Sequence, residues 1–443
     1  MVLRCAPDVK PDNGALMGRF DGPGVSSELR TWVDREFPKL WGGQTVSELG
    51  SSITALALPT AAVLVLHANP LQVGLLAAMT RIPFPFLSLL AGVVVDRLPR
   101  RPILILCDAG RCLVLGSIPL TASLNLLSVP QLYLTAFVSG VLTVFFDVAY
   151  LSYVPSLASR DRLGDANARL QMSLSLAQVA GPGLAGLLVQ LVGAARAIAA
   201  DSASFLASAL AILWIRKPED PPDAADRGGL ARELADGLRF VWTHPILRAQ
   251  IVIIAYTVIG GHFIDGVQYV FAYRDAHLTP GLYGLALALS SLGAFAGLAM
   301  VKRVTAWLGV GPSLAIGFGG PAVTLAFLPL ALVLPAVAVI TVLFFLASMT
   351  DPVANINQVT LRQSVTRDRY LGRMNSIFRT VVWGAIPLGS IVGGALASAF
   401  GTVATFEVGA AIGITGSAAL FISPVGRLRD YPRPTDTIRP QPT

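Results

Sequence analysis

The chain has 443 residues, of which 54% are hydrophobic and 13% are charged, and its mean hydropathy is +0.66. Soluble domains carry about 25% charged residues, so a chain this apolar cannot hide its apolar surface in a soluble fold. Its net charge of +7 does not indicate nucleic-acid binding, because the basic residues fall in the gaps between apolar runs rather than on polar domains. The composition therefore predicts a polytopic membrane protein.

Twelve apolar runs follow one another along the chain, each close to the length of about 20 residues that a membrane-spanning helix needs. The only long connection between them, residues 216–245, divides them into six and six. We expect an all-α integral membrane fold with twelve transmembrane helices in two six-helix bundles. The runs cover approximately residues 40–66, 71–95, 102–124, 130–153, 166–191, 196–215, 247–273, 282–301, 310–332, 334–357, 375–400 and 403–422.

The order of the runs predicts five regions. Residues 1–38 are polar and rich in Gly, Pro and Asp, which indicates a disordered cytoplasmic tail. Residues 39–215 and 247–425 form the two bundles, and residues 426–443 form a second cytoplasmic tail. In the central loop, residues 216–246, four apolar residues recur at helical spacing and predict an amphipathic helix on the inner leaflet, or a connector packed under the bundles. They are Leu230, Leu234, Leu238 and Val241.

Basic residues indicate the orientation of the chain. Of its 33 lysines and arginines, 28 lie in the tails and in the loops on the same side as the tails, whereas only Arg196 and Arg274 lie in the opposite turns. Arg81, Arg111 and Arg379 fall within the runs. Lys and Arg are retained on the cytoplasmic side of a membrane. We therefore expect a multi-pass protein of the cell membrane with both termini in the cytoplasm.

Cysteine and histidine spacing predicts no disulfide scaffold, no metal site and no cofactor. Cys5 lies in a polar tail, and Cys107 and Cys112 lie in one apolar run on different faces of a helix. The chain contains no G-x-x-x-x-G-K-[ST] motif, so it is not an ATP-driven pump on its own. We also find no catalytic set of Ser, His and Asp at matching depth, and expect no enzymatic activity.

Two basic turns repeat each other in the two halves. Residues 160–167 read RDRLGDAN and residues 367–375 read RDRYLGRMN, about 207 residues later. Each turn follows an apolar run that carries an acid, Asp147 in the fourth run and Asp351 in the tenth. The repeat predicts a gene duplication and two pseudo-symmetric bundles.

The turn between the second and third runs carries the most informative motif, formed by Gly92, Asp96, Arg97, Arg100 and Arg101. It resembles the G-x-x-x-D-R-x-x-R-R motif that the major facilitator superfamily of transporters carries at this place. Here Leu98-Pro99 replaces the usual Gly between the arginines. The resemblance implies twelve helices around a central cavity, which opens alternately to the two sides of the membrane.

The same resemblance implies that this turn is a conformational gate. Asp96 would meet the start of the eleventh span near Asn375, and the arginines would pair with acids that follow the fourth span. Asp96 ends a helix, where the helix dipole disfavours an anion, so it needs a partner. The alternative is that the three arginines only anchor the topology.

Charges within spans cost about 2.5–3.5 kcal/mol each on insertion scales, and so mark candidate functional sites. Asp108 and Arg111 lie three residues apart on one helical face, and with Asp147 they predict a buried charge network under the turn. The alternative is a purely structural ion pair. Arg81 precedes Pro83 in the second span, and either faces the cavity, where it binds anionic groups, or pairs with a neighbouring acid.

Proton coupling requires a carboxylate or a histidine whose protonation responds to the opening of the cavity. Two pairs share a helical face at a spacing of three or four residues, His262 with Asp265 and Asp351 with Asn355. The alternative is that each member of these pairs is a structural residue whose hydrogen bonds are satisfied within the protein. The remaining candidates for coupling or substrate contact are Glu48, one turn after Gln44, Arg81 and Arg379.

The fifth span contains Gly181, Pro182 and Gly186, which resemble the G-P-x-x-G-G signature of antiporters in the superfamily, with Ala185 in place of one glycine. Ordinary packing of small residues is the alternative. The segments 40–50, 81–83 and 160–167 resemble the branch of proton-driven macrolide-type drug exporters and siderophore exporters. This branch implies proton antiport of a drug, an antibiotic or a siderophore through a mostly apolar cavity by a monomer. An uptake symporter and a non-transporting membrane sensor are the alternatives.

Overall fold

The computed structural model describes residues 25–158, 162–217, 219 and 238–432. These residues fold into helices joined by short turns, and twelve helical segments are long and apolar enough to cross a membrane. The prediction of an all-α fold with twelve spans is confirmed. The tails at 1–24 and 433–443, and Leu230 and Leu234 of the central loop, lie outside the described residues.

The first bundle contains six spans, of which the second is broken into two helices at Ile82. Its helices are α1 (Val25–Leu64), α2 (Pro70–Arg81), α3 (Pro83–Val95), α4 (Arg100–Ser123), α5 (Val129–Leu157), α6 (Leu163–Val192) and α7 (Ala194–Leu213).

The second bundle also contains six spans, and its first span is broken at His262 and Phe263. Its helices are α9 (Pro245–Gly261), α10 (Ile264–Val270), the π-helix η2 (Phe271–Asp275), α11 (Pro280–Leu308), α12 (Val310–Phe327), the 3₁₀ helix η3 (Leu328–Leu332), α13 (Ala336–Val365), α14 (Asp368–Phe400) and α15 (Thr402–Ile422).

The start of α1 corrects one prediction. The sequence predicts a disordered tail up to residue 38 with at most a short helix over residues 26–36, whereas α1 begins at Val25 and continues without a break into the first span. Contacts close to residue 38 explain part of this order. Phe37 is buried in an apolar cluster with Ala158 and Ala166, and the Glu36 carboxylate accepts the backbone N–H of Arg216 at 3.0 Å.

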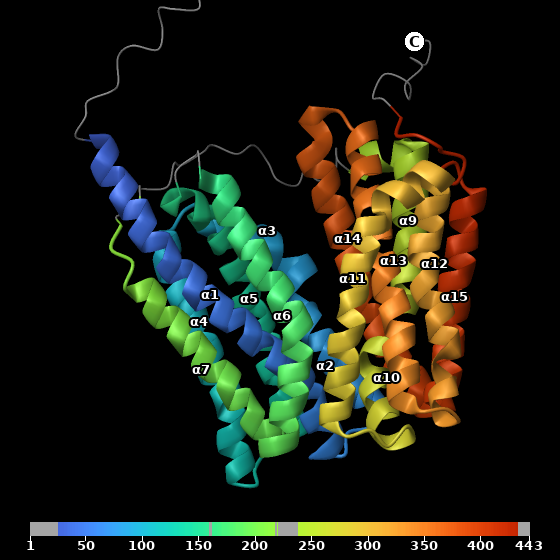
Figure 1. Cartoon of the computed structure of the whole chain (residues 1–443), viewed down its shortest axis with the longest axis horizontal. Helices are drawn as coiled ribbons and strands as arrows, with labels where there is room; N and C mark the ends of the chain where they lie inside the picture. The colour runs from blue at the N-terminus through green and yellow to red at the C-terminus, as the bar shows by residue number, and fades with distance from the viewer. Residues whose placement is uncertain (1–24, 159–161, 218, 220–237, 433–443) are drawn as a thin grey trace, which may run out of the picture.

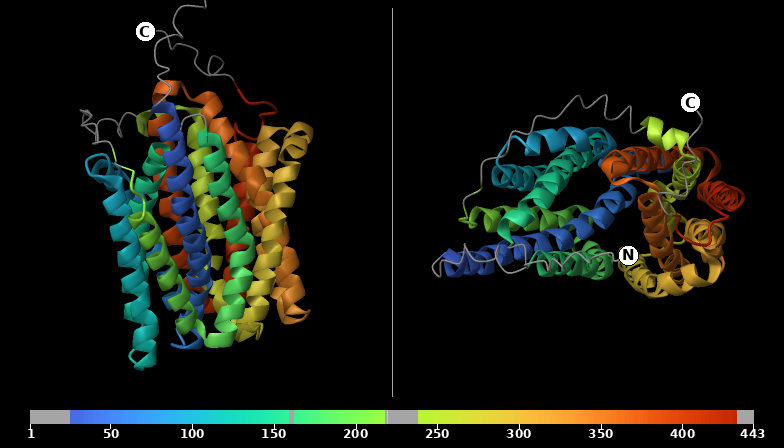
Figure 2. Two further views of the ribbon diagram at one scale, coloured as in Figure 1. Left: turned by 60° about the vertical axis from the view of Figure 1, so that its left-hand side comes forward. Right: turned by 90° about the horizontal axis from the view of Figure 1, so that it is seen from above.

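The two bundles stand side by side, with α2 and α10 between them (Figures 1 and 2). Helices α1, α4, α6 and α14 begin at one end of the molecule, which we call the terminal face, and α3 and α7 end there. The terminal face is uppermost in Figure 1, where the ribbons of the bundles are further apart than at the opposite face.

The turns of the two halves repeat each other in backbone conformation. His67 and His277 both adopt φ of 52° in the first turn of their bundles, and each is followed three residues later by the proline that begins the next helix. Single glycines with φ of 86° and 87°, Gly193 and Gly401, connect α6 to α7 and α14 to α15. These equivalent pairs are 208 to 210 residues apart, which agrees with the predicted duplication.

Paired glycines bring the bundles into backbone contact toward the opposite face. A Cβ on Gly186 of α6 would lie 2.8 Å from the Cα of Gly284 on α11, and a Cβ on Gly74 of α2 would lie 3.1 Å from the Cα of Gly394 on α14. The two contacts are related by the same sequence offset. Small residues allow this approach, which favours van der Waals packing where lipid gives no hydrophobic driving force.

Seven hydrogen bonds between described residues also join the bundles at this end. Tyr273 and Thr60 share one between their hydroxyls at 2.8 Å, and the Arg274 guanidinium donates to the carbonyls of Val63 and Ala68 at 3.2 and 2.9 Å. The other four are made by Tyr269, Leu71, Thr279 and Gly281. The opposite face is therefore closed by polar as well as glycine contacts.

The glycine contact between α6 and α11 is testable by Gly186→Ala. The new Cβ would lie 2.6 Å from the Pro280 carbonyl oxygen, and overpacking of this kind costs about 1–3 kcal/mol. We expect the thermal unfolding midpoint of the purified protein to fall by about 2–4 °C. Gly261→Ala is the matched control, because its Cβ would meet nothing within 4 Å. Equal midpoints for the two variants would contradict the tight contact.

Candidate functional site

The predicted gate turn lies at the terminal face, between α3 and α4. Asp96 closes α3, and its backbone N–H donates to the Gly92 carbonyl. Gly92 has open space where a Cβ would be. The start of α4 is capped by Glu219, whose carboxylate accepts the backbone N–H groups of Arg100 and Arg101 at 2.8 and 3.2 Å. An anion at this helix end is favoured by the helix dipole.

The acid against the gate arginines therefore comes from the central connection, whereas the resemblance implied acids after the fourth span. The Arg100 guanidinium lies 3.8 Å from Glu219, and the Arg101 guanidinium donates to the carbonyls of Ile212 and Leu213 at the end of α7. Asp161 and Arg160 lie outside the described residues. The pairing of Asp96 with the region of Asn375, and the part played by Arg97, stay predictions.

The first residues of the central connection are fixed to the first bundle. The Lys39 ammonium donates to the Trp214 carbonyl at 2.9 Å and pairs with Glu36 at the same distance, and the Lys217 ammonium donates to the Ser156 carbonyl. Together with Glu219, these contacts attach the connection to α1, α4 and α5. These contacts could not be predicted from the sequence, because Lys39, Lys217 and Glu219 look there like ordinary charged residues of loops.

Asp108 and Arg111 form a buried ion pair within α4, as their spacing predicts. The Arg111 guanidinium lies between two aromatic rings, with its Cζ 4.3 Å from the centroid of Phe146 and 4.1 Å from that of Phe205. Two rings and a carboxylate satisfy this cation deep in the bundle. Its surroundings are those of a structural pair.

Asp147 interacts electrostatically with Arg111 of that pair and also with a charged group across the boundary between the bundles. The charged groups that act on its carboxylate are Arg111, Glu48 on α1 and Arg379 on α14 of the second bundle. The Glu48 carboxylate accepts the Gln44 side-chain amide at 2.8 Å. The structure thus brings three predicted candidates, Glu48, Asp147 and Arg379, to one region between the halves.

His262 and Asp265 lie together at the break between α9 and α10. His262 Nδ1 and Asp265 Oδ2 are 2.8 Å apart, and the Ser390 hydroxyl of α14 donates to the same Asp265 oxygen at 3.2 Å. The two side chains are 34% and 28% exposed. The predicted pair is therefore formed, remains accessible and is held by a third residue from another helix.

Three further candidate residues, Asp351, Asn355 and Arg81, lie outside these groups. Asp351 and Asn355 are exposed on one face of α13, where Asn355 accepts the Gln358 side-chain amide at 3.3 Å. Arg81 is exposed at the end of α2, next to the break before Pro83. The predicted candidates therefore occupy several places between and around the helices rather than one compact centre.

The glycine motif of α6 has two packing roles. A Cβ on Gly181 would lie 2.3 Å from the Cβ of Ser52 on α1, whereas Gly186 meets Gly284 across the boundary. The Pro182 carbonyl oxygen would lie 2.5 Å from a Cβ on Gly284. The motif thus sets the distance from α6 to a helix of each bundle.

Sequence analysis missed Asp201 and an aromatic pocket. Asp201 on α7 is 1% exposed, and its carboxylate accepts the Ser204 hydroxyl at 3.1 Å. An acid inside an apolar run was a visible signal. The pocket lies between α3 and α14, where the Phe84 and Trp383 rings are 5.3 Å apart, and no sequence pattern joins these two residues.

Comparison with known proteins agrees with this twelve-span fold. The family described as transmembrane secretion effector, of the major facilitator superfamily, matches residues 26–436. The chain belongs to this family. It is 28% identical over 371 residues to the multidrug efflux pump Tap of Mycolicibacterium fortuitum, covering 81% of this chain and 88% of that protein. It is 24% identical to the enterobactin exporter EntS of Shigella flexneri, covering 81% and 83%.

Solved structures show the same fold at low sequence identity. The nucleoside transporter NupG superposes with a TM-score of 0.70 at 11% identity, covering 89% of this chain and 99% of that one. A bacterial homologue of the lysosomal transporter Spinster, in an inward-facing and unoccupied conformation, gives 0.68 at 13% identity, covering 93% and 99%. The secretion effector is a multi-pass membrane transporter rather than an enzyme, and its two bundles are those of the major facilitator fold.

The buried pair of α4 is testable by comparing one and two substitutions. Asp108→Leu leaves the Arg111 cation buried without its carboxylate, which costs about 3–5 kcal/mol. The double variant D108L/R111M removes both charges, and we expect its thermal unfolding midpoint to lie clearly above that of D108L. A double variant no more stable than the single one would contradict a structural pair.

The cap at the gate turn is testable by limited trypsin digestion in detergent. Glu219→Ala leaves the backbone N–H groups of Arg100 and Arg101 without their acceptor, and each hydrogen bond contributes about 0.5–1.5 kcal/mol. We expect faster cleavage after Arg97 and Arg100 than in the wild type. Asp430→Ala, which removes an exposed acid beyond the last span, is the control. Equal cleavage rates in both variants would show that Glu219 does not hold the turn.

Proposed function

We propose that this secretion effector exports a small amphiphilic compound, such as a drug, an antibiotic or a siderophore, by proton antiport. Cargo and protons move in opposite directions as the bundles rock about the contacts at the opposite face. We place both termini and the terminal face in the cytoplasm, as the basic residues indicate, and propose that the protein works as a monomer.

The His262–Asp265 pair carries the proton-coupling part of the proposal. An accessible carboxylate beside an imidazole can hold a proton on one side of the membrane and release it on the other. The Ser390 hydroxyl, 3.2 Å from Asp265, belongs to α14, which also carries the glycine contact with α2. A Cβ on Gly266, the residue after Asp265, would lie 2.5 Å from the Cα of Gly74 on α2, so the first bundle also packs beside the pair. Rocking of one bundle against the other would therefore change the surroundings of the pair, which links protonation to rocking.

Support for an amphiphilic cargo comes from the cavity between α3 and α14. Three aromatic side chains and a proline line it, together with three hydroxyls and one charged side chain, Arg379. Sugars and amino acids require a denser set of hydrogen-bonding groups. Relatives named as a multidrug efflux pump and as an enterobactin exporter favour export over uptake.

Proteoliposomes carrying a pH gradient test the proposal. With pyranine inside the vesicles, addition of an amphiphilic probe such as ethidium or 2-naphthoate should release protons only when the protein is present. Asp265→Asn should lower this coupled flux by about tenfold, which corresponds to about 1.4 kcal/mol in the barrier to transport. Asp430→Asn, which removes an exposed acid beyond the last span, is the control and should retain the flux.

Three outcomes would count against parts of the proposal. Full proton-driven flux in both Asp265→Asn and Asp351→Asn would remove both acids from the coupling step. Absence of any probe-dependent flux in the wild type, across a panel of drugs and chelators, would favour the non-transporting sensor. Probe and protons moving in the same direction would favour the symporter.

A further inference from the structure

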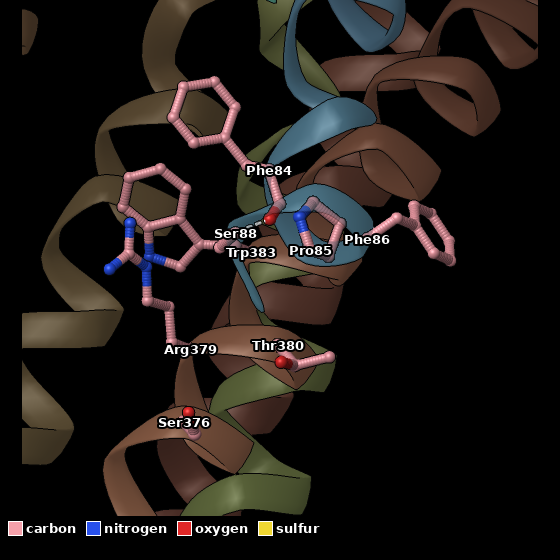
Figure 3. Close-up of a pocket in the computed structure, with 8 residues that line it drawn as sticks. All are labelled: Phe84, Pro85, Phe86, Ser88, Ser376, Arg379, Thr380 and Trp383. Atoms are coloured by element: carbon pink, nitrogen blue, oxygen red, sulfur yellow. Dashed lines mark hydrogen bonds between the residues drawn. The ribbon is translucent and has the colours of Figure 1, made fainter. Parts of the chain in front are cut away.

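A cavity of about 300 Å³ lies between α3 of the first bundle and α14 of the second. Phe84 and Trp383 stack against each other on one side of it, with ring centroids 5.3 Å apart at 37°. Figure 3 shows the Arg379 guanidinium beside the Trp383 indole, whereas Phe86 points away from both. Because each bundle contributes one wall, an occupant of this cavity contacts both halves of the transporter.

The cavity combines aromatic rings with one cation and several hydroxyls. The Arg379 Cζ lies 5.5 Å from the Trp383 ring centroid. Ser376 lies one turn before Arg379 on α14, and Thr380 is the next residue after it. Arg379 is the tenth residue of its span, which places it roughly 14 Å from the end of the span at 1.5 Å per residue. A guanidinium at this depth is a strong site for an anionic oxygen group.

No described acid neutralises the charge of Arg379 at close range. Within the described part of the chain, no carboxylate lies within 4 Å of its guanidinium, and its partner Asp147 acts over a longer distance. Asp147 also interacts with Arg111 and Glu48. This differs from Arg111, which has a carboxylate and two rings around it.

We propose that the cavity between α3 and α14 binds an amphiphilic anion, with a flat apolar body packed against the Phe84 and Trp383 rings and a carboxylate, sulfonate or phosphate on Arg379. The inference rests on the proposed export function, and names the class of cargo for it. The same chemistry is present in the head group of an anionic lipid, so the experiment below separates a free amphiphile from a lipid.

Binding to the full chain in phosphatidylcholine nanodiscs tests the proposal without any gradient. The probes are 2-naphthoate and its neutral amide, 2-naphthamide, which share one ring system and differ in charge. By isothermal titration calorimetry, Arg379→Gln should raise the Kd of naphthoate by about tenfold or more and leave that of naphthamide within about twofold. Arg379→Lys should retain part of the preference for the anion, and Trp383→Ala should weaken the binding of both probes.

Arg196→Gln is the matched control, because it removes an exposed arginine from a turn at the opposite face. It should bind both probes like the wild type. An equal Kd for naphthoate in the wild type and in Arg379→Gln, with both proteins folded by their unfolding midpoints, would overturn the proposal. Since no transport is measured, a failure of proton coupling would leave this result unaffected.

Nanodiscs that contain phosphatidylglycerol identify the source of the anion. If the lipid head group occupies the site, the Kd of naphthoate for the wild type is higher in these nanodiscs than in pure phosphatidylcholine. The Kd for Arg379→Gln is then the same in both lipids. If the site takes a free amphiphile, the Kd of the wild type is the same in both lipids. Either result retains the anion site on Arg379.

Discussion

The arrangement of this transporter depends on the distance between its two bundles at the opposite face, which paired glycines set. Gly186 with Gly284, and Gly74 with Gly394, allow backbone to touch backbone where a methyl group would not fit. The hydrogen bonds of Tyr273 and Arg274 lie at the same end. The predicted gate turn and the cavity between α3 and α14 lie further toward the terminal face, whereas the His262–Asp265 pair lies beside the contact of Gly74.

Two arginines that lie within spans, Arg111 and Arg379, show how surroundings separate structure from function. Arg111 lies inside one bundle, where Asp108 and the rings of Phe146 and Phe205 surround it. Arg379 lies at the edge of a cavity, beside one indole and without a close carboxylate among the described residues. Both positions cost free energy in a membrane, but only at Arg379 is room left for an external anion.

The fold follows from the sequence because lipid admits few backbone arrangements, so the lengths of the apolar runs determine the number of helices. The breaks at Ile82 and His262, and the early start of α1 at Val25, are not visible in hydropathy. Local pairs such as His262–Asp265 were predicted from spacing. Contacts between distant segments, such as Glu219 with Arg100 or Phe84 with Trp383, were not, because they depend on tertiary packing.

The single glycines between α6 and α7, and between α14 and α15, restrict how the halves can move. One residue adds only about 3.8 Å of chain, so neither hairpin has slack to let its two helices slide lengthwise past each other. Gly193 and Gly401 hold φ of 86° and 87°, which other residues rarely adopt. Any tilt of α6 or α14 is therefore transmitted to the helix that follows it, α7 or α15. Each hairpin moves as one rigid unit whose turn lies at the opposite face.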